Sequence, residues 1–269
     1  MTATAISAPA RGARMQQARH AWELLYLLTR RDLKLRYQDT ALGFIWTAMK
    51  PLLFAMVIWF AMSKVVRFQV DMPYHLFLLS ALLPWTLFQT SVMVSTPLIV
   101  NNGSLIKKIP FPVFVLPLAI IANNTIHFML SLPVLVVFLL LAGYVPGPKW
   151  LVGLPFLLAL QLALMMGLSL ALSGLDVHFR DLEHLVEVML NLLFYATPIL
   201  YPISKAPGQW ADILKLNPLA PLIESWRDLL VLNQLPGTDI LISVALTAVI
   251  VAAGSVIFAK LRPTLADYL

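Results

Sequence analysis

The densest group of side chains able to do chemistry lies in one short segment, DVHFRDLEHLVE, which runs from Asp176 to Glu187. Carboxylates and imidazoles are the groups that ligate metals or exchange protons. The titratable residues of the segment are Asp176, His178, Asp181, Glu183, His184 and Glu187. The segment lacks the H-E-x-x-H spacing of zinc hydrolases. We therefore expect neither a metal site nor a catalytic residue, and we interpret Arg180 and Asp181 as an ion pair or as contacts of a docking partner.

A second group of charges occupies residues 30–36, RRDLKLR, with its cations at Arg30, Arg31, Lys34 and Arg36. Mostly apolar and aromatic residues recur around it at three- and four-residue spacing, namely Trp22, Leu25, Tyr26, Thr29, Leu33 and Tyr37. This pattern predicts an amphipathic helix over residues 19–38 at the membrane surface, its cations directed to lipid phosphates or to an acidic partner. The same pattern is also typical of a simple topology signal beside a first membrane crossing.

A third segment, NNGSLIKKIPFP at residues 101–112, is framed by a glycine and two prolines. It sets two lysines, Lys107 and Lys108, beside three apolar residues, Leu105, Ile106 and Ile109. Such a turn can insert into a groove on a soluble partner, the apolar side chains anchoring it and the lysines steering it. A plain cationic hairpin between two crossings is the alternative.

The elements that carry these segments follow from composition, because 60% of the 269 residues are hydrophobic, 12% are charged and the mean hydropathy is +0.83. These values predict an all-α integral membrane protein. Six apolar runs approach or exceed the length of a crossing: Gly43 to Val66, Leu76 to Val100, Val113 to Tyr144, Trp150 to Leu175, Leu185 to Leu200 and Ile240 to Ala259. We expect a flexible tail over residues 1–18 and one transmembrane domain over residues 19–269, with six crossings between residues 43 and 260.

The distribution of Lys and Arg predicts the orientation. Twelve of the nineteen fall in the two termini and in the loops on their side. Six fall on the opposite side, namely Lys64, Arg67, Lys149, Lys205, Lys215 and Arg227. By the positive-inside rule, both termini are expected in the cytoplasm. The net charge of +6 therefore indicates membrane orientation rather than nucleic-acid binding, since the cations are dispersed over loops. The absence of cysteine excludes disulfides and a cysteine nucleophile.

Residues 201–237, on the predicted outer side, are too long for a turn and too often broken by proline to cross. Apolar residues with helical spacing between Leu219 and Leu230 predict one short re-entrant helix between the fifth and sixth crossings. Asn217-Pro218 and Pro221 separate it from a first such piece around Trp210 and Ile213. A nucleotide-binding motif of the form G-x-x-x-x-G-K-[ST] does not occur in the sequence, so any ATP-driven work requires an ATPase on another chain.

Five motifs in this order carry a family resemblance: RRDLKLRYQDTALGFIW, LIKKIPFP, DVHFRDLEH, ATPILYP and NPLAPLIESWRDLL. From about Trp22 to the C-terminus, the chain resembles the membrane subunit of ABC-2-type polysaccharide exporters, the permeases for O-antigen, capsule and teichoic-acid-like polymers. The resemblance implies a transport subunit without its own ATPase site in a bacterial inner membrane. It also implies a homodimer, two soluble ATPase subunits that hold ATP and Mg, and export of a polysaccharide carried on polyprenyl diphosphate.

The resemblance further implies two sets of site residues. The substrate path takes in Arg36, Tyr37, Leu42, Gly43, Trp46, Phe194 and Tyr195. The surface that docks the ATPase takes in Arg30, Arg31, Lys34, Leu105, Ile106, Lys107, Lys108, Ile109, Pro110, Arg180 and Asp181. Aromatic rings suit a sliding sugar chain because they offer flat apolar faces to sugar C–H groups. Two alternatives remain: an ABC-2 exporter of a drug or small lipid, and a lone membrane enzyme that acts on a lipid-linked substrate through the 176–187 segment.

Overall fold

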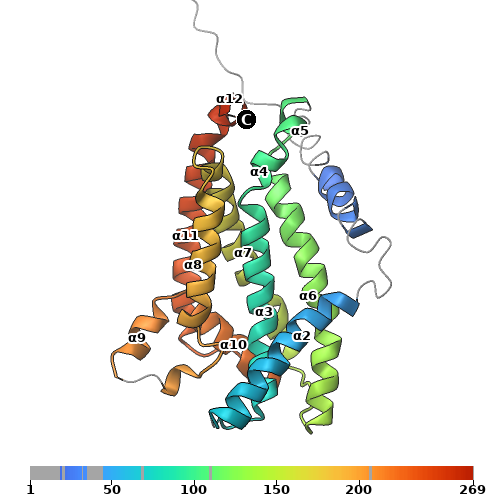
Figure 1. The fold of residues 1–269 in the computed structure, drawn as a ribbon, viewed down its shortest axis with the longest axis vertical. Coiled ribbons are helices and arrows are strands. Elements are labelled where there is room, and N and C mark those ends of the chain that lie inside the picture. The colour runs from blue at the N-terminus through green and yellow to red at the C-terminus, as the bar shows by residue number, and fades with distance from the viewer. Residues whose placement is uncertain are drawn as a thin grey trace, which may run out of the picture.

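A computed structural model shows the chain as an elongated bundle of helices (Figure 1). The structure describes residues 19, 22–31, 33–34, 45–67, 70–108, 111–205 and 208–268, and within these ranges it contains helices, turns and loops but no strand. The all-α prediction is therefore confirmed for the described part of the chain.

Four helices in the described part are long and apolar enough to cross a membrane. They are α3 (Tyr74–Ser95), α6 (Val115–Leu141), α7 (Trp150–Asp176) and α11 (Ile240–Leu261). These helices coincide with the second, third, fourth and sixth predicted crossings. Their ends lie at prolines, glycines or charges, as at Pro73 before α3 and Asp239 before α11.

The first and fifth predicted crossings form shorter helices. The first is α2 (Ile45–Phe60), which continues into the π-helical turn η1 (Ala61–Val65), and the fifth is α8 (Leu182–Ala196). The fifth was expected to run to Leu200, but it ends at Ala196 because Thr197 precedes a proline and takes an extended backbone. The 15 residues of α8 rise about 22 Å, less than a hydrocarbon core of about 30 Å. The count of six crossings therefore stays a prediction.

Helix α3 lies at the centre of the bundle and packs against α2, α6, α7, α8 and α10 (α10, Leu219–Leu232). Its sequence is apolar on all sides, which is the pattern of a helix buried in its protein. Trp85 and Phe88 on α3 are among the largest fully buried side chains. Because α3 is covered on nearly every side, it is the fixed element against which the others are placed.

Helices α7 and α11 form the closest helix pair, through glycines at their crossing point. A Cβ atom at Gly254 on α11 would overlap the carbonyl oxygen of Gly167 on α7. Conversely, a Cβ atom at Gly167 would lie 2.8 Å from the Cα of Val251. Small residues let the two backbones touch, and this is how helices gain packing energy in lipid, where burial of apolar area contributes little.

The two ends of the bundle carry different short elements. At the end that we name the α10 end lie α9 (Trp210–Lys215), α10 and the 3-10 turn η2 (Ile203–Lys205). The opposite end, the α12 end, carries α4 (Leu98–Asn101), α5 (Gly103–Lys108), the 3-10 turn η3 (Arg262–Thr264) and α12 (Leu265–Tyr268). Figure 1 shows the C-terminus at the α12 end, with α9 beside the bundle at the α10 end. Two short helices were predicted for residues 201–237, and α9 and α10 are those helices.

A separate small apolar core holds the α12 end. It consists of Ile99, Val113, Leu116, Leu170, Val177, Phe258 and Leu265. Leu28 from the N-terminal helical segment and Ile106 from α5 pack against it. The described N-terminal residues 22–31 are helical, in agreement with the amphipathic helix predicted over residues 19–38. That segment is therefore attached to the bundle through Leu28.

Candidate functional site

One side of α8 carries polar residues that a lipid-facing helix would not expose. Glu183, Glu187, Asn191 and Tyr195 follow one another at four-residue spacing, so they form a single stripe along the helix, and all four are exposed. Within the hydrocarbon region, carboxylates and amides are costly unless they face water or protein. The stripe is therefore a candidate face for contact with water or with a polar ligand.

Helix α2 meets α8 through a cluster of aromatic rings. The ring of Phe194 on α8 lies 6.2 Å from that of Phe54 on α2 and 5.6 Å from that of Trp85 on α3. Tyr195, its neighbour, contacts the Phe194 ring edge to face at 5.2 Å but is itself 66% exposed. Both residues were predicted to line the substrate path, but the structure places them differently. Phe194 packs inside the bundle, and Tyr195 lies on the exposed face of α8.

Large apolar side chains surround this open face. On α2 the exposed ones are Leu53, Phe54, Met56, Val57 and Phe60, and on α8 they are Leu185, Val188, Met189 and Leu192. Trp46 lies in the first turn of α2, and its side chain is outside the description, as are the predicted path residues Arg36, Tyr37, Leu42 and Gly43. In the described part, the candidate path is therefore the face of α2 and α8.

The segment that follows α8, Thr197 to Ile203, is held by side chains of α3 and α10. Arg227 on α10 donates from one terminal nitrogen to the carbonyl of Pro198 at 2.7 Å and to that of Ile199 at 3.5 Å. The Tyr74 hydroxyl donates to the carbonyl of Leu200 at 3.0 Å, and the Glu224 carboxylate accepts the N–H of Ile203 at 3.0 Å. The backbone groups of the segment after α8 are thus satisfied inside the protein.

Arg227 is itself deeply buried, with 3% of its surface exposed. Its Nε donates to the carbonyl of Phe77 at 3.3 Å, and its guanidinium carbon lies 3.6 Å from the centre of the Phe77 ring. Burial lowers the pKa of Arg227 to about 10, which leaves the group charged at neutral pH. Burial also raises the pKa of Glu224 one turn away on α10.

Sequence reasoning placed Arg227 among the outer-loop cations and missed this role. The missed signal is its position in the helical pattern, because Arg227 is four residues after Ile223 and four before Val231, both buried. A charge within the apolar stripe of an amphipathic helix points into the protein. The same reasoning missed Gln161 on α7, whose amide donates to the Pro84 carbonyl at 2.6 Å and accepts the Trp226 indole N–H at 2.7 Å.

The predicted docking residues that are described lie at the α12 end. Arg30, Arg31, Lys34, Lys107, Lys108, Arg180 and Asp181 are exposed there, whereas Leu105 and Ile106 are half-buried. Ile106 packs against the chain's own small core, so α5 is a supported helix rather than a free loop. Ile109 and Pro110 lie outside the described residues. The cations thus form an exposed surface on a fixed base.

The 176–187 segment is built around contacts within the chain. Its ring at His178 lies 4.4 Å from the ring of Tyr268 in α12, and His178 Nε2 lies 3.4 Å from the Thr264 hydroxyl. Both Arg180 and Asp181 are described, and they make no ion pair with each other. Among the described residues, no three side chains of the metal-ligating types lie together. The segment therefore joins α7, α8 and the C-terminal helix.

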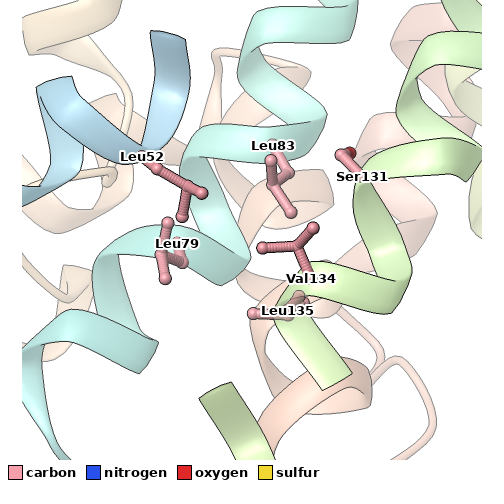
Figure 2. Close-up of a pocket in the computed structure, with 6 residues that line it drawn as sticks. All are labelled: Leu52, Leu79, Leu83, Ser131, Val134 and Leu135. Atoms are coloured by element: carbon pink, nitrogen blue, oxygen red, sulfur yellow. The ribbon is translucent and has the colours of Figure 1, made fainter. Parts of the chain in front are cut away.

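Figure 2 shows a small cavity between α2, α3 and α6, lined by Leu52, Leu79, Leu83, Ser131, Val134 and Leu135. The Ser131 hydroxyl donates its proton in a hydrogen bond to the Phe128 carbonyl at 2.7 Å, and the other five lining side chains are apolar. Each of the three helices has an internal proline beside the cavity, Pro51, Pro84 and Pro133. Proline removes a backbone hydrogen bond and bends a helix, so a gap is expected where three such helices meet.

Residues 23–231 match the ABC-2 type transporter family, and the chain belongs to this family of membrane proteins. The O-antigen export system permease protein RfbA of Klebsiella pneumoniae is 37% identical over 250 residues, which cover 93% of this chain and 96% of that protein. A protein of the same name from Myxococcus xanthus is 36% identical over 249 residues, covering 91% and 94%. The polysialic acid transport protein KpsM of Escherichia coli is 25% identical over 218 residues, covering 77% and 79%.

Proposed function

We propose that this chain is the transmembrane subunit of an ABC exporter that moves a polysaccharide, linked to polyprenyl diphosphate, from the cytoplasm across the inner membrane. Relatives that share nearly the whole length of the chain are named for O-antigen export, and a more distant one is named for polysialic acid transport. The family match supports the transport class. That the polysaccharide is linked to polyprenyl diphosphate is inferred from the family resemblance of the sequence motifs alone.

The observation that carries this proposal is the stripe on α8. Glu183, Glu187, Asn191 and Tyr195 expose carboxylates, an amide and a phenol along a helix whose other exposed side chains, apart from His184, are apolar. A hydrated sugar chain needs hydrogen-bonding partners that do not hold any one hydroxyl tightly, together with flat apolar faces such as the ring of Tyr195. The face of α2 and α8 offers both kinds of surface.

In this proposal α2 and α8 complete six crossings, and the α12 end faces the cytoplasm. Exposed cations at that end, from Arg30 to Arg262, support this orientation through the positive-inside rule. A second copy of the chain covers the open face of α2 and α8, so that two such faces enclose one central path. Arg36, Tyr37, Leu42, Gly43 and Trp46 extend this path toward the carrier headgroup.

The energy for transport comes from a partner. The sequence has no nucleotide-binding motif of its own, so two copies of a soluble ATPase subunit hold ATP and Mg and dock at the α12 end. Lys107 and Lys108 on α5, with Arg180 beside α8, are the exposed cations that steer this docking. Because Ile106 fixes α5 to the bundle, a push on α5 reaches the helices directly.

The first experiment purifies the tagged chain from its own host in mild detergent and measures, by quantitative mass spectrometry, which soluble proteins come with it. An equimolar ATPase with Walker motifs is the expected result. Deletion of the gene should then remove a surface polysaccharide. Finding no ATPase under conditions that keep other membrane complexes intact would overturn the proposal and favour a lone membrane enzyme.

A charge reversal tests the docking surface. The double variant Lys107→Glu and Lys108→Glu should lose at least ten-fold in ATPase recovered with the chain, while the chain itself stays folded, since both side chains are exposed. The matched control reverses two exposed lysines at the α10 end, Lys64→Glu and Lys149→Glu, and should recover the ATPase normally. Equal recovery with both double variants would remove α5 from the docking surface.

A further inference from the structure

We propose that Arg227 is a positioning residue that fixes the α10 end of α8, so that α8 moves about this end during transport. The proposal rests on the proposed function, in which α8 lines the path. It goes beyond that function because it assigns a role in the motion to a residue that touches neither the path nor the ATPase. The described contacts support it in three steps.

First, Arg227 joins three separate pieces of the bundle. It lies on α10 and donates hydrogen bonds to the carbonyls of Pro198 and Ile199, just after α8. It also donates a hydrogen bond to the carbonyl of Phe77 on α3. Since α3 is the buried centre of the bundle, this set of bonds ties the end of α8 to the element that has least freedom to move. Loss of Arg227 would leave three buried carbonyls without this donor.

Second, the chemistry of the site suits arginine. The carbonyls of Pro198 and Ile199 lie at the C-terminal end of α8, where a positive charge is favoured by the helix dipole. No described carboxylate lies within ion-pair distance of Arg227, so its donors stay directed to the backbone. A planar guanidinium can bond in two directions and also lie over the Phe77 ring, whereas a lysine amine is a single point of charge.

Third, the two ends of α8 differ. Its first turn has no side-chain cap at Asp181; the Glu183 N–H donates to the Asp176 carboxylate on α7, and the side chains of Glu183 and His184 are exposed. At the other end, Thr197 receives a hydrogen bond from the Asn217 amide at 2.9 Å, in addition to the bonds from Arg227 and Tyr74 to the following residues. A force applied by a partner near Arg180 and Asp181 therefore meets the end of α8 with fewer side-chain hydrogen bonds to the rest of the bundle, and α8 turns about the other end.

The test uses hydrogen–deuterium exchange on the whole exporter, with and without a non-hydrolysable ATP analogue. In the wild type, the nucleotide should change exchange over residues 182–189, at the α12 end of α8, and leave residues 193–205 unchanged. In Arg227→Met, exchange over 193–205 should rise at least ten-fold and become sensitive to nucleotide. That variant should keep ATP hydrolysis and lose export at least ten-fold, while Arg227→Lys should recover part of the export.

The control variant is Lys215→Met, which removes a nearby cation that pairs with Asp239 at 2.8 Å but lies outside the Arg227 contacts. It should leave exchange over 193–205 and export unchanged. A nucleotide effect of equal size at both ends of α8 in the wild type would overturn the proposal, and so would full export by Arg227→Met. If Arg227→Met does not fold, the proposal is still tested by the nucleotide effect at the two ends of α8 in the wild type and by the export activity of Arg227→Lys.

The exchange experiment also separates this proposal from the proposed function. If no ATPase accompanies the chain, the exporter assignment fails, and exchange over 193–205 in the isolated chain still reports whether Arg227 holds that segment. If the ATPase is present but Arg227→Lys and Arg227→Met both behave as wild type, the exporter assignment stands and the positioning role of Arg227 fails.

Discussion

At the α10 end, side chains from α3, α7 and α10 exchange buried hydrogen bonds, whereas at the α12 end the helices rest on a small apolar core and exposed cations. The bonds of Gln161 to Pro84 and Trp226 are 2.6 and 2.7 Å long. By contrast, the contact of Thr264 with His178 at the α12 end is 3.4 Å long and half-buried. In lipid, buried polar contacts between helices fix their relative positions.

The difference between the ends indicates which part of the bundle is held more firmly. An end joined by several directional bonds has one favoured arrangement, because each bond lost leaves a buried group unpaired. An apolar core tolerates sliding at smaller cost, since its contacts are not directional. The α12 end is therefore suited to respond to a partner, and the α10 end is suited to stay in place.

The largest effect is expected from alanine at Gly254, where α11 crosses α7. A Cβ atom at Gly254 would overlap the Gly167 carbonyl, so Gly254→Ala should separate the helices and cost about 3 kcal/mol. Gly174→Ala, nearer the α12 end, would place its Cβ 3.4 Å from a Leu261 methyl, an ordinary contact, and should be nearly neutral. Unfolding in mixed SDS micelles measures both, and equal costs would show that the pair is no tighter at its crossing than near the α12 end.

A smaller effect is expected from the polar contacts themselves. Gln161→Leu keeps the volume but leaves the Trp226 indole and the Pro84 carbonyl without Gln161, so it should cost about 1–3 kcal/mol. Thr264→Val at the α12 end removes only half-buried contacts and should cost below about 1 kcal/mol. The same SDS titration ranks the two variants. A cost for Thr264→Val as large as that for Gln161→Leu would contradict the contrast between the ends.

The smallest effect is a pH dependence at the α10 end. Burial raises the pKa of Glu224, and the Ile203 N–H and the charge of Arg227 offset this in part. Burial likewise raises the pKa of Asp228, and Arg227 lowers it in part. A carboxyl with a raised pKa in the folded state contributes stability at low pH that is lost as the pH rises through that pKa. The melting temperature should therefore rise slightly as the pH is lowered from 7 to 5. In Glu224→Gln this rise should be smaller, and the remainder should come from Asp228.

Much of the bundle follows from sequence because long apolar runs have few alternatives in a membrane. The bounds of α7 were predicted to within one residue at its C-terminal end, at Asp176, and α11 begins at the predicted Ile240. The short helices α9 and α10 followed from Asn217-Pro218 and from apolar spacing, and Asn217 indeed accepts the N–H of Leu219 at 3.0 Å. These features depend on local pattern and on turn residues, which a sequence displays directly.

What the sequence did not reveal are the contacts between distant residues. Arg227 and Phe77 are 150 positions apart, and Gln161 and Pro84 are 77 apart, so no local pattern joins them. Counting Arg227 among the outer cations was useful for predicting the orientation of the chain, but the count carries no information on whether its side chain is buried. Phe194 and Tyr195 were treated alike because adjacent residues look equivalent in a sequence, although a helix turns about 100° between them and sends one inward.

The shortness of α8 has a consequence for the surrounding lipid. Its 15 residues rise about 22 Å, so the hydrocarbon core of an ordinary bilayer is about 8 Å thicker than α8 is long. Such hydrophobic mismatch is relieved by local thinning of the bilayer or by placing other protein at that depth. The segment from Thr197 to Ile203 can take this place, because side chains of α3 and α10 already satisfy its backbone. In the proposed exporter, the depth that α8 does not span is thus filled by protein backbone rather than by lipid, beside the helix that carries the polar stripe.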